Sequence, residues 1–69
     1  MRNWRAIVGR NVRRLRLAKG MTQERLAFGA ELDLTYVGAI ERGRRNPSLL
    51  AMARIAEALD AQLSDLIAE

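Results

Sequence analysis

The sequence predicts a compact all-α domain of five short helices, and three observations support this prediction. Apolar residues recur at helical spacings of three and four, and no segment shows the sustained alternation that is typical of a strand. Capping residues and glycines divide the chain into five such segments. The 69 residues, 49% of them hydrophobic, are enough for a single folded domain, which we expect over residues 1–69.

The first two helices have recognisable boundaries. The first is expected over residues 4–18, and Gly20 is its natural stop. Thr22 is the expected N-cap of a second helix over about residues 23–29. A capping box would have an acid at position 25, where this chain has Arg25, so the signal is partial. The inward residues of the first helix are Trp4, Val8, Val12 and Leu15.

The remaining three helices follow at short intervals. Asp33 is the expected N-cap of a third helix over residues 34–42, which Gly43 stops. After a loop, Ser48 is expected to cap a fourth helix over residues 49–59, and Ser64 a last single turn that ends near residue 68. The expected inward residues are Val37 and Ile40 in the third helix, and Leu49, Met52, Ile55, Ala56 and Leu59 in the fourth.

Positive charge is concentrated in one part of the chain. Residues 1–45 hold 11 basic and 4 acidic side chains, whereas residues 46–69 hold one and four. Eleven of the twelve cations are arginine, whose planar fork matches phosphates and guanine edges. This asymmetry indicates a polyanionic partner that meets one part of the surface. The alternative is that the arginines reflect genomic base composition and solubility.

The composition also excludes several classes of function. The chain has no Cys and no His, which removes disulfides, iron–sulfur clusters, most zinc sites and the commonest general base. An enzyme would have to use carboxylates, Ser, Thr, Lys or Arg, and the sequence places no pair of carboxylates in an evident pocket and has no phosphate-binding glycine loop. We therefore expect no enzyme, no metal and no cofactor. No segment approaches the about 20 apolar residues of a membrane span, and no signal peptide is recognisable, so a cytoplasmic protein is expected. Binding of the first helix to a membrane surface through Trp4 and its neighbouring arginines is the weaker alternative.

The second and third predicted helices form the outline of a helix-turn-helix over residues 22–42. Three stretches, at residues 20–27 (GMTQERLA), 32–43 (LDLTYVGAIERG) and 45–49 (RNPSL), resemble the phage repressor/Cro-type helix-turn-helix family, also known as the xenobiotic-response-element family. The resemblance covers about residues 8–67, and its finer pattern is similar to the controller proteins of restriction–modification systems. It implies a lambda-repressor-like DNA-binding domain.

The resemblance also implies roles for individual residues. The third helix would enter the major groove and the second would cross the DNA backbone. Leu34 and Ala39 are departures from the family, because they offer only apolar contact where polar readers are usual. Gly38 is explained either by close approach to DNA or by a tight helix–helix contact, and Tyr36 either by DNA contact or by half-buried packing. The implied base-facing residues are Leu34, Thr35, Tyr36, Gly38, Ala39, Arg45 and Asn46, and the implied phosphate contacts are Thr22, Gln23, Arg42 and Arg44.

Two further features of the family concern local structure. Arg16 and Glu41 match positions that form an ion pair inside the bundle, so they are expected to hold the reading helix in place. Glu31 stands where a left-handed backbone is common, which would strain it by about 1 kcal/mol. The alternative is that Gly29 adopts this conformation.

The predicted function is a sequence-specific transcriptional regulator that binds a two-fold-related operator as a homodimer, as a repressor or controller protein. The candidate dimer contacts are Leu50, Ala61 and Ile67. No small-molecule effector is expected, because the chain leaves no room for a separate ligand domain. An antitoxin or another protein-interaction module that retains the fold is the alternative, and the weakly polar face of the third helix supports it.

Overall fold

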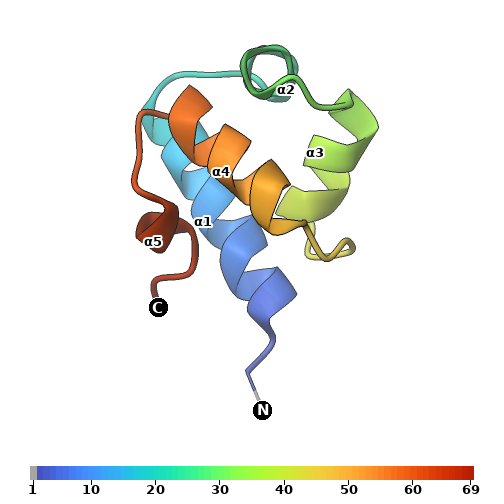
Figure 1. Ribbon diagram of the computed structural model, residues 1–69, viewed down its shortest axis with the longest axis vertical. Helices are drawn as coiled ribbons and strands as arrows, with labels where there is room; N and C mark the ends of the chain where they lie inside the picture. Colours follow the sequence, from blue (N-terminus) through green and yellow to red (C-terminus); the bar gives the residue numbers. More distant parts are fainter. Residues whose placement is uncertain (1) are drawn as a thin grey trace.

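The computed structural model describes residues 2–69, and within them it shows five α-helices and no strand. The helices are α1 (Trp4–Ala18), α2 (Gln23–Ala30), α3 (Leu34–Glu41), α4 (Leu49–Ala58) and α5 (Leu63–Leu66). The all-α prediction is confirmed, and the first four helices begin where the sequence predicts and end within one residue of the predicted position. Figure 1 shows α1 running past α4, with α2 at the top of the view, seen nearly end-on, and α3 running down the right side.

Side-chain caps explain why the helices begin where they do. Thr22 Oγ1 accepts a hydrogen bond from the Arg25 amide at 3.0 Å. Asp33 Oδ1 accepts one from the Thr35 amide at 2.8 Å, and Ser48 Oγ accepts one from the Ala51 amide at 3.0 Å. Each bond satisfies one of the amides that a helix start leaves without a partner. The three predicted caps are therefore confirmed.

The last helix differs from the prediction. It begins at Leu63 with Gln62 as its N-cap, so the expected cap at Ser64 is wrong. The carboxylate of Asp65 accepts a hydrogen bond from the Gln62 amide at 2.9 Å. Because this bond satisfies the backbone at position 62, the helix begins two residues earlier than a Ser64 cap would allow.

The core lies where the inner faces of α1, α2, α3 and α4 meet, and Leu66 of α5 closes it. Two expected inward residues lie outside it: Trp4 is 50% exposed and Leu49 is 68% exposed. Each is the first residue of its helix, and in α4 the buried residue of the first turn is Ala51. The core cluster is Val8, Val12, Leu26, Ala27, Ala30, Val37, Ile40, Ile55, Ala56, Leu59 and Leu66.

Buried Asn11 anchors the C-terminal segment to α1. Its side-chain Nδ2 donates to the backbone oxygen of Leu66 at 2.9 Å and to that of Ala68 at 2.7 Å. These bonds satisfy carbonyls that the end of α5 leaves free. This role of Asn11 has no local sequence signal, because both partners lie at least 55 residues away.

Gly9 allows the backbones of α1 and α3 to come into direct contact. A Cβ atom at this position would lie 2.3 Å from the carbonyl oxygen of Ile40 and 2.8 Å from that of Glu41. Both distances are far shorter than van der Waals contact, so only glycine fits here. The sequence signal was a glycine inside a helical segment, which costs helix propensity and therefore indicates a packing requirement.

The left-handed residue between α2 and α3 is Glu31, with φ 57° and ψ 44°. Gly29 lies inside α2 and does not adopt this conformation. The Leu32 amide donates to the Ala27 oxygen at 2.9 Å, which closes the helix end. Asp60 has φ 53° after α4, where the Ala61 amide donates in the same way to Ala56. Of the two candidates for the left-handed conformation between α2 and α3, Glu31 and Gly29, Glu31 therefore carries the backbone strain.

We predict that Gly9→Ala destabilises the protein by about 2–3 kcal/mol or more, because neither carbonyl can move without separating α1 from α3. Gly29→Ala is the matched control, since its Cβ would lie 3.4 Å from the Ala58 Cβ, an ordinary contact. This control should be neutral or stabilising by up to about 1 kcal/mol through helix propensity. Urea unfolding of both variants measures the difference, and equal stabilities would contradict the prediction.

We also predict that Glu31→Gly stabilises the fold by about 0.5–1 kcal/mol, because glycine adopts positive φ without strain. Glu31→Ala keeps the Cβ atom and removes the charge, so it should give no comparable gain. The measurement is the free energy of unfolding in urea. An equal gain in the alanine variant would assign the effect to charge instead of backbone strain.

Candidate DNA interface

The packing of α2 against α3 holds the helix-turn-helix in shape. Leu26 of α2 and Val37 and Ile40 of α3 are fully buried. The connection consists of residues 31–33, and the half-buried Leu32 within it packs against the core. Both helices have eight residues, and Figure 1 shows the short connection between them at the upper right of the view, above the α3 label. The outer side of α3 is thereby left free to meet a partner.

The outer side of α3 carries small or apolar residues. Leu34 and Thr35 are exposed, and Ala39 is half-buried. Gly38 is buried, and a Cβ atom there would meet the Arg42 Nη1 atom at 3.1 Å and the Gln23 Oε1 atom at 3.6 Å. These neighbours are side chains, so Gly38 is not explained by tight helix–helix packing. The close helix crossing lies at Gly9 instead.

Tyr36 connects α3 to the loop that follows it and to α4. The ring is half-buried against the core, which is the packing alternative that the sequence left open. Its hydroxyl oxygen accepts a hydrogen bond from the Ser48 amide at 3.3 Å. The guanidinium carbon of Arg45 lies 5.0 Å from the ring centre, within the range of a cation–π contact. Tyr36 therefore supports the position of Arg45.

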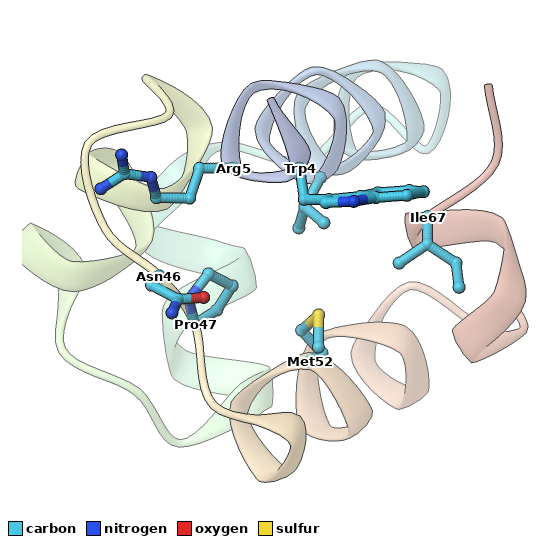
Figure 2. Close-up of a pocket in the computed structure, with 7 residues that line it drawn as sticks. Trp4, Arg5, Asn46, Pro47, Met52 and Ile67 are labelled. Carbon is cyan, nitrogen blue, oxygen red and sulfur yellow. The ribbon is translucent and has the colours of Figure 1, made fainter. Parts of the chain in front are cut away.

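The loop after α3 presents several exposed polar groups. Arg42, Arg44 and Arg45 are all exposed, and no acidic side chain pairs with them among residues 2–69. Asn46 is also exposed, and it lies at the rim of an apolar cleft of about 260 Å³ between α1 and α4 (Figure 2). The other residues that line this cleft are Trp4, Arg5, Val8, Pro47, Met52 and Ile67.

A buried ion pair joins α1 to the end of α3. Arg16 Nε donates to Glu41 Oε2 at 2.6 Å, and Arg16 Nη2 donates to Glu41 Oε1 at 3.0 Å. The side chains are only 7% and 2% exposed. The hydrogen bond to Glu41 raises the pKa of Arg16 above its ordinary value, although burial acts in the opposite direction. Arg16 therefore stays charged. Its Nη1 atom donates a further hydrogen bond to the backbone oxygen of Met21 at 2.7 Å.

The same carboxylate holds Gln23, the first residue of α2. Gln23 Nε2 donates to Glu41 Oε1 at 3.0 Å, which fixes the orientation of the amide group. One N–H of this amide is used by Glu41, and a second remains for another acceptor. Gln23 is half-buried, so it is not the fully solvated residue that its position alone would suggest.

The start of α2 is surrounded by positive charge. Lys19 and Arg25 line an open cleft together with Thr22, and both cations are exposed. The first-turn amides of α2 and the helix dipole add to the attraction for an anion. Lys19 and Arg25 are not among the residues that the sequence predicts to contact phosphate. The replacement of the capping-box acid by Arg25 was the available signal.

Two classes of feature are absent from the described part of the chain. Residues 2–69 hold no group of three or more His, Cys, Asp or Glu side chains that could bind a metal ion. None of the helices within these residues has the length and apolar character needed to cross a membrane.

Comparison with known proteins identifies the family. A family model described as "Helix-turn-helix" matches residues 12–66. The control protein C.BamHI of Bacillus amyloliquefaciens is 47% identical over 66 residues, which cover 94% of this chain and 82% of that protein. The immunity repressor protein of Bacillus phage phi105 is 39% identical over 62 residues, covering 90% of this chain and 43% of that protein.

Solved structures agree with this relationship. The restriction–modification controller protein C.AhdI from Aeromonas hydrophila has a TM-score of 0.87 at 47% identity, covering 90% of this chain and 94% of that chain. The hypothetical transcription factor NHTF from Neisseria has a TM-score of 0.90 at 40% identity, covering 94% and 75%. The chain therefore belongs to the Cro/C1-type helix-turn-helix family of DNA-binding transcriptional regulators, together with the restriction–modification controller proteins.

Proposed function

We propose that this regulator binds a two-fold-related operator as a homodimer, with α3 in the major groove and the start of α2 on the DNA backbone. One observation carries the proposal: Gln23, from the start of α2, and Arg42, from the end of α3, both lie within 4 Å of the same point above Gly38. The candidate phosphate contact and the reading helix therefore share one surface.

The proposed base contacts follow from the exposed chemistry of α3 and its loop. Leu34 and Ala39 suit the methyl group of thymine, and the Thr35 hydroxyl can donate or accept a hydrogen bond. Arg45, supported by Tyr36, and Asn46 extend the contact surface beyond the helix. The proposed phosphate contacts are Thr22, Gln23, Arg42 and Arg44, to which the structure adds Lys19 and Arg25 as candidates.

The acidic C-terminal part supplies the proposed dimer contact. Leu50 is 61% exposed and Ile67 is 47% exposed, although both are large apolar side chains. Leu49, beside Leu50 at the start of α4, and Leu63, at the start of α5, are also exposed. Ala61 packs partly against the core and therefore offers less surface. A second copy that covers these side chains would bury apolar area. Dimeric helix-turn-helix proteins bind half-sites about one DNA turn apart, which is the spacing we expect of the operator.

The regulatory effect would follow from where the operator lies. An operator that overlaps a promoter would make the protein a repressor, because the bound dimer blocks polymerase. An operator upstream of a promoter would suit an activating controller. Selection of bound sequences from random double-stranded DNA tests the proposal, and a two-fold-symmetric consensus is expected. Enrichment of a single unpaired half-site would rule out dimeric reading, and no enrichment would rule out sequence-specific binding.

We predict different effects for arginines in different places. Arg44→Ala should weaken binding to all sequences and reduce the salt dependence by about one phosphate contact. Arg45→Ala should cost about 1–3 kcal/mol and relax the preference at one base position. Arg54→Ala, on α4 among the acidic residues, is the matched control and should leave the base preferences and the salt dependence of binding unchanged. Titrations of cognate and shuffled DNA at several salt concentrations distinguish these outcomes, and an equal loss in all three variants would contradict the proposed surface.

We also predict that Leu50→Glu and Ile67→Glu each raise the dimer dissociation constant at least tenfold, since a buried apolar side chain contributes about 1.5–3 kcal/mol. Leu17→Glu, on exposed α1 surface, is the matched control and should leave dimerisation unchanged. Sedimentation equilibrium measures the constant, and circular dichroism checks the fold. If neither Leu50→Glu nor Ile67→Glu raises the dimer dissociation constant, the interface lies elsewhere.

A further inference from the structure

The centre of the α3 outer side is occupied by side chains from other positions. Residues 34, 38 and 42 follow one another along one side of the helix, because they are spaced by four. Gly38 has no side chain, yet it is buried, since Arg42 and Gln23 cover it. A DNA base that approached position 38 would therefore meet Arg42 and Gln23.

Arg42 folds back along α3. Its own backbone lies just after the last residue of the helix, at the C-cap, but its Nη1 atom is 3.1 Å from the point where a Gly38 Cβ would be. The side chain thus points toward the helix N-terminus and covers the preceding turn, as long helical side chains do. The Cβ atom of an alanine at position 38 would lie 3.1 Å from this nitrogen, a distance shorter than nine in ten Cβ contacts in proteins. The guanidinium would therefore have to shift.

The amide group of Gln23 gives the guanidinium a suitable neighbour. Glu41 binds Gln23 Nε2 at 3.0 Å, and Gln23 Oε1 lies 3.6 Å from the same Gly38 position that Arg42 approaches. The Gln23 Oε1 and Arg42 Nη1 atoms both lie within 4 Å of this position, where an amide oxygen is an electrostatically favourable neighbour for a guanidinium. The guanidinium has five N–H donors that can bind another partner. Because Arg16 holds Glu41 in turn, the surroundings of Arg42 are ordered from the core outward.

We propose that Arg42 reads a guanine in each half-site, and that Gly38 is the positioning residue that lets its guanidinium lie on the reading side of α3. This inference rests on the proposed entry of α3 into the major groove, and it reassigns Arg42 from phosphate contact to base contact. Arginine binds guanine O6 and N7 with two parallel hydrogen bonds. Leu34 and Ala39 have no side-chain donor, so Arg42 would supply the strongest polar contact on this helix.

The test compares base preferences of the full chain and its variants. Random double-stranded DNA is selected with the wild type, Arg42→Ala, Gly38→Ala and the double variant, and the winners are checked by titration with all four bases at each position. We expect the wild type to prefer guanine at one position per half-site. In Arg42→Ala, the preference for guanine over the other bases at that DNA position should fall at least tenfold. The preferences at the other DNA positions should be unchanged. Gly38→Ala should weaken the same position, and the double variant should be no worse than Arg42→Ala alone.

Several results would overturn the inference. A wild-type consensus without a guanine that depends on Arg42, or an equal loss by Arg42→Ala for every sequence, would return Arg42 to phosphate binding. An unchanged guanine preference in Gly38→Ala would remove the positioning role. Gly38→Ala raises helix propensity, and the clash involves only the end of a flexible side chain, so this variant should fold, as urea unfolding verifies. If the wild type itself enriches no sequence, the proposed function fails first, which is a distinguishable result.

Discussion

The buried pair between Arg16 and Glu41 is the interaction on which the reading surface depends. It joins α1 to the last residue of α3 through two hydrogen bonds, at the crossing where Gly9 brings the two backbones together. Loss of one partner would leave a buried charge without compensation, at a cost of about 3–5 kcal/mol. The orientation of α3 is thus set by polar geometry as well as by apolar packing.

The same pair links the interior to the proposed DNA contacts. Glu41 accepts bonds from both Arg16 and Gln23, so one carboxylate orders a residue of α1 and the first residue of α2. Gln23 in turn lies beside Arg42 above Gly38. Groups that meet DNA must be held in place before binding, because ordering them during association weakens affinity. The network from Arg16 through Glu41 to Gln23 is such a support.

The sequence predicted the local features well and the tertiary ones less well. Caps such as Thr22 and Asp33 depend on residues two or three positions away, so spacing alone identifies them. The role of Gly9 depends on which helix crosses α1, and the exposure of Leu49 depends on where α4 meets its neighbours. The Arg16–Glu41 contact was implied by the family resemblance, not by the residues alone. Which of the candidate residues contact DNA remains a prediction, because it depends on a partner that lies outside the chain.

The shortness of α3 has a consequence for how the protein acquires its activity. An isolated helix of eight residues is unstable in water, so α3 persists only through its contacts with the rest of the domain. Those contacts include α1, which is itself anchored to the C-terminal segment through Asn11 and Leu66. Through α1, the reading helix therefore depends on contacts that extend along the chain as far as Leu66. The arginines of the reading surface thus owe their arrangement to a residue at the other end of the domain, which lies far from them in the sequence and belongs to a different helix.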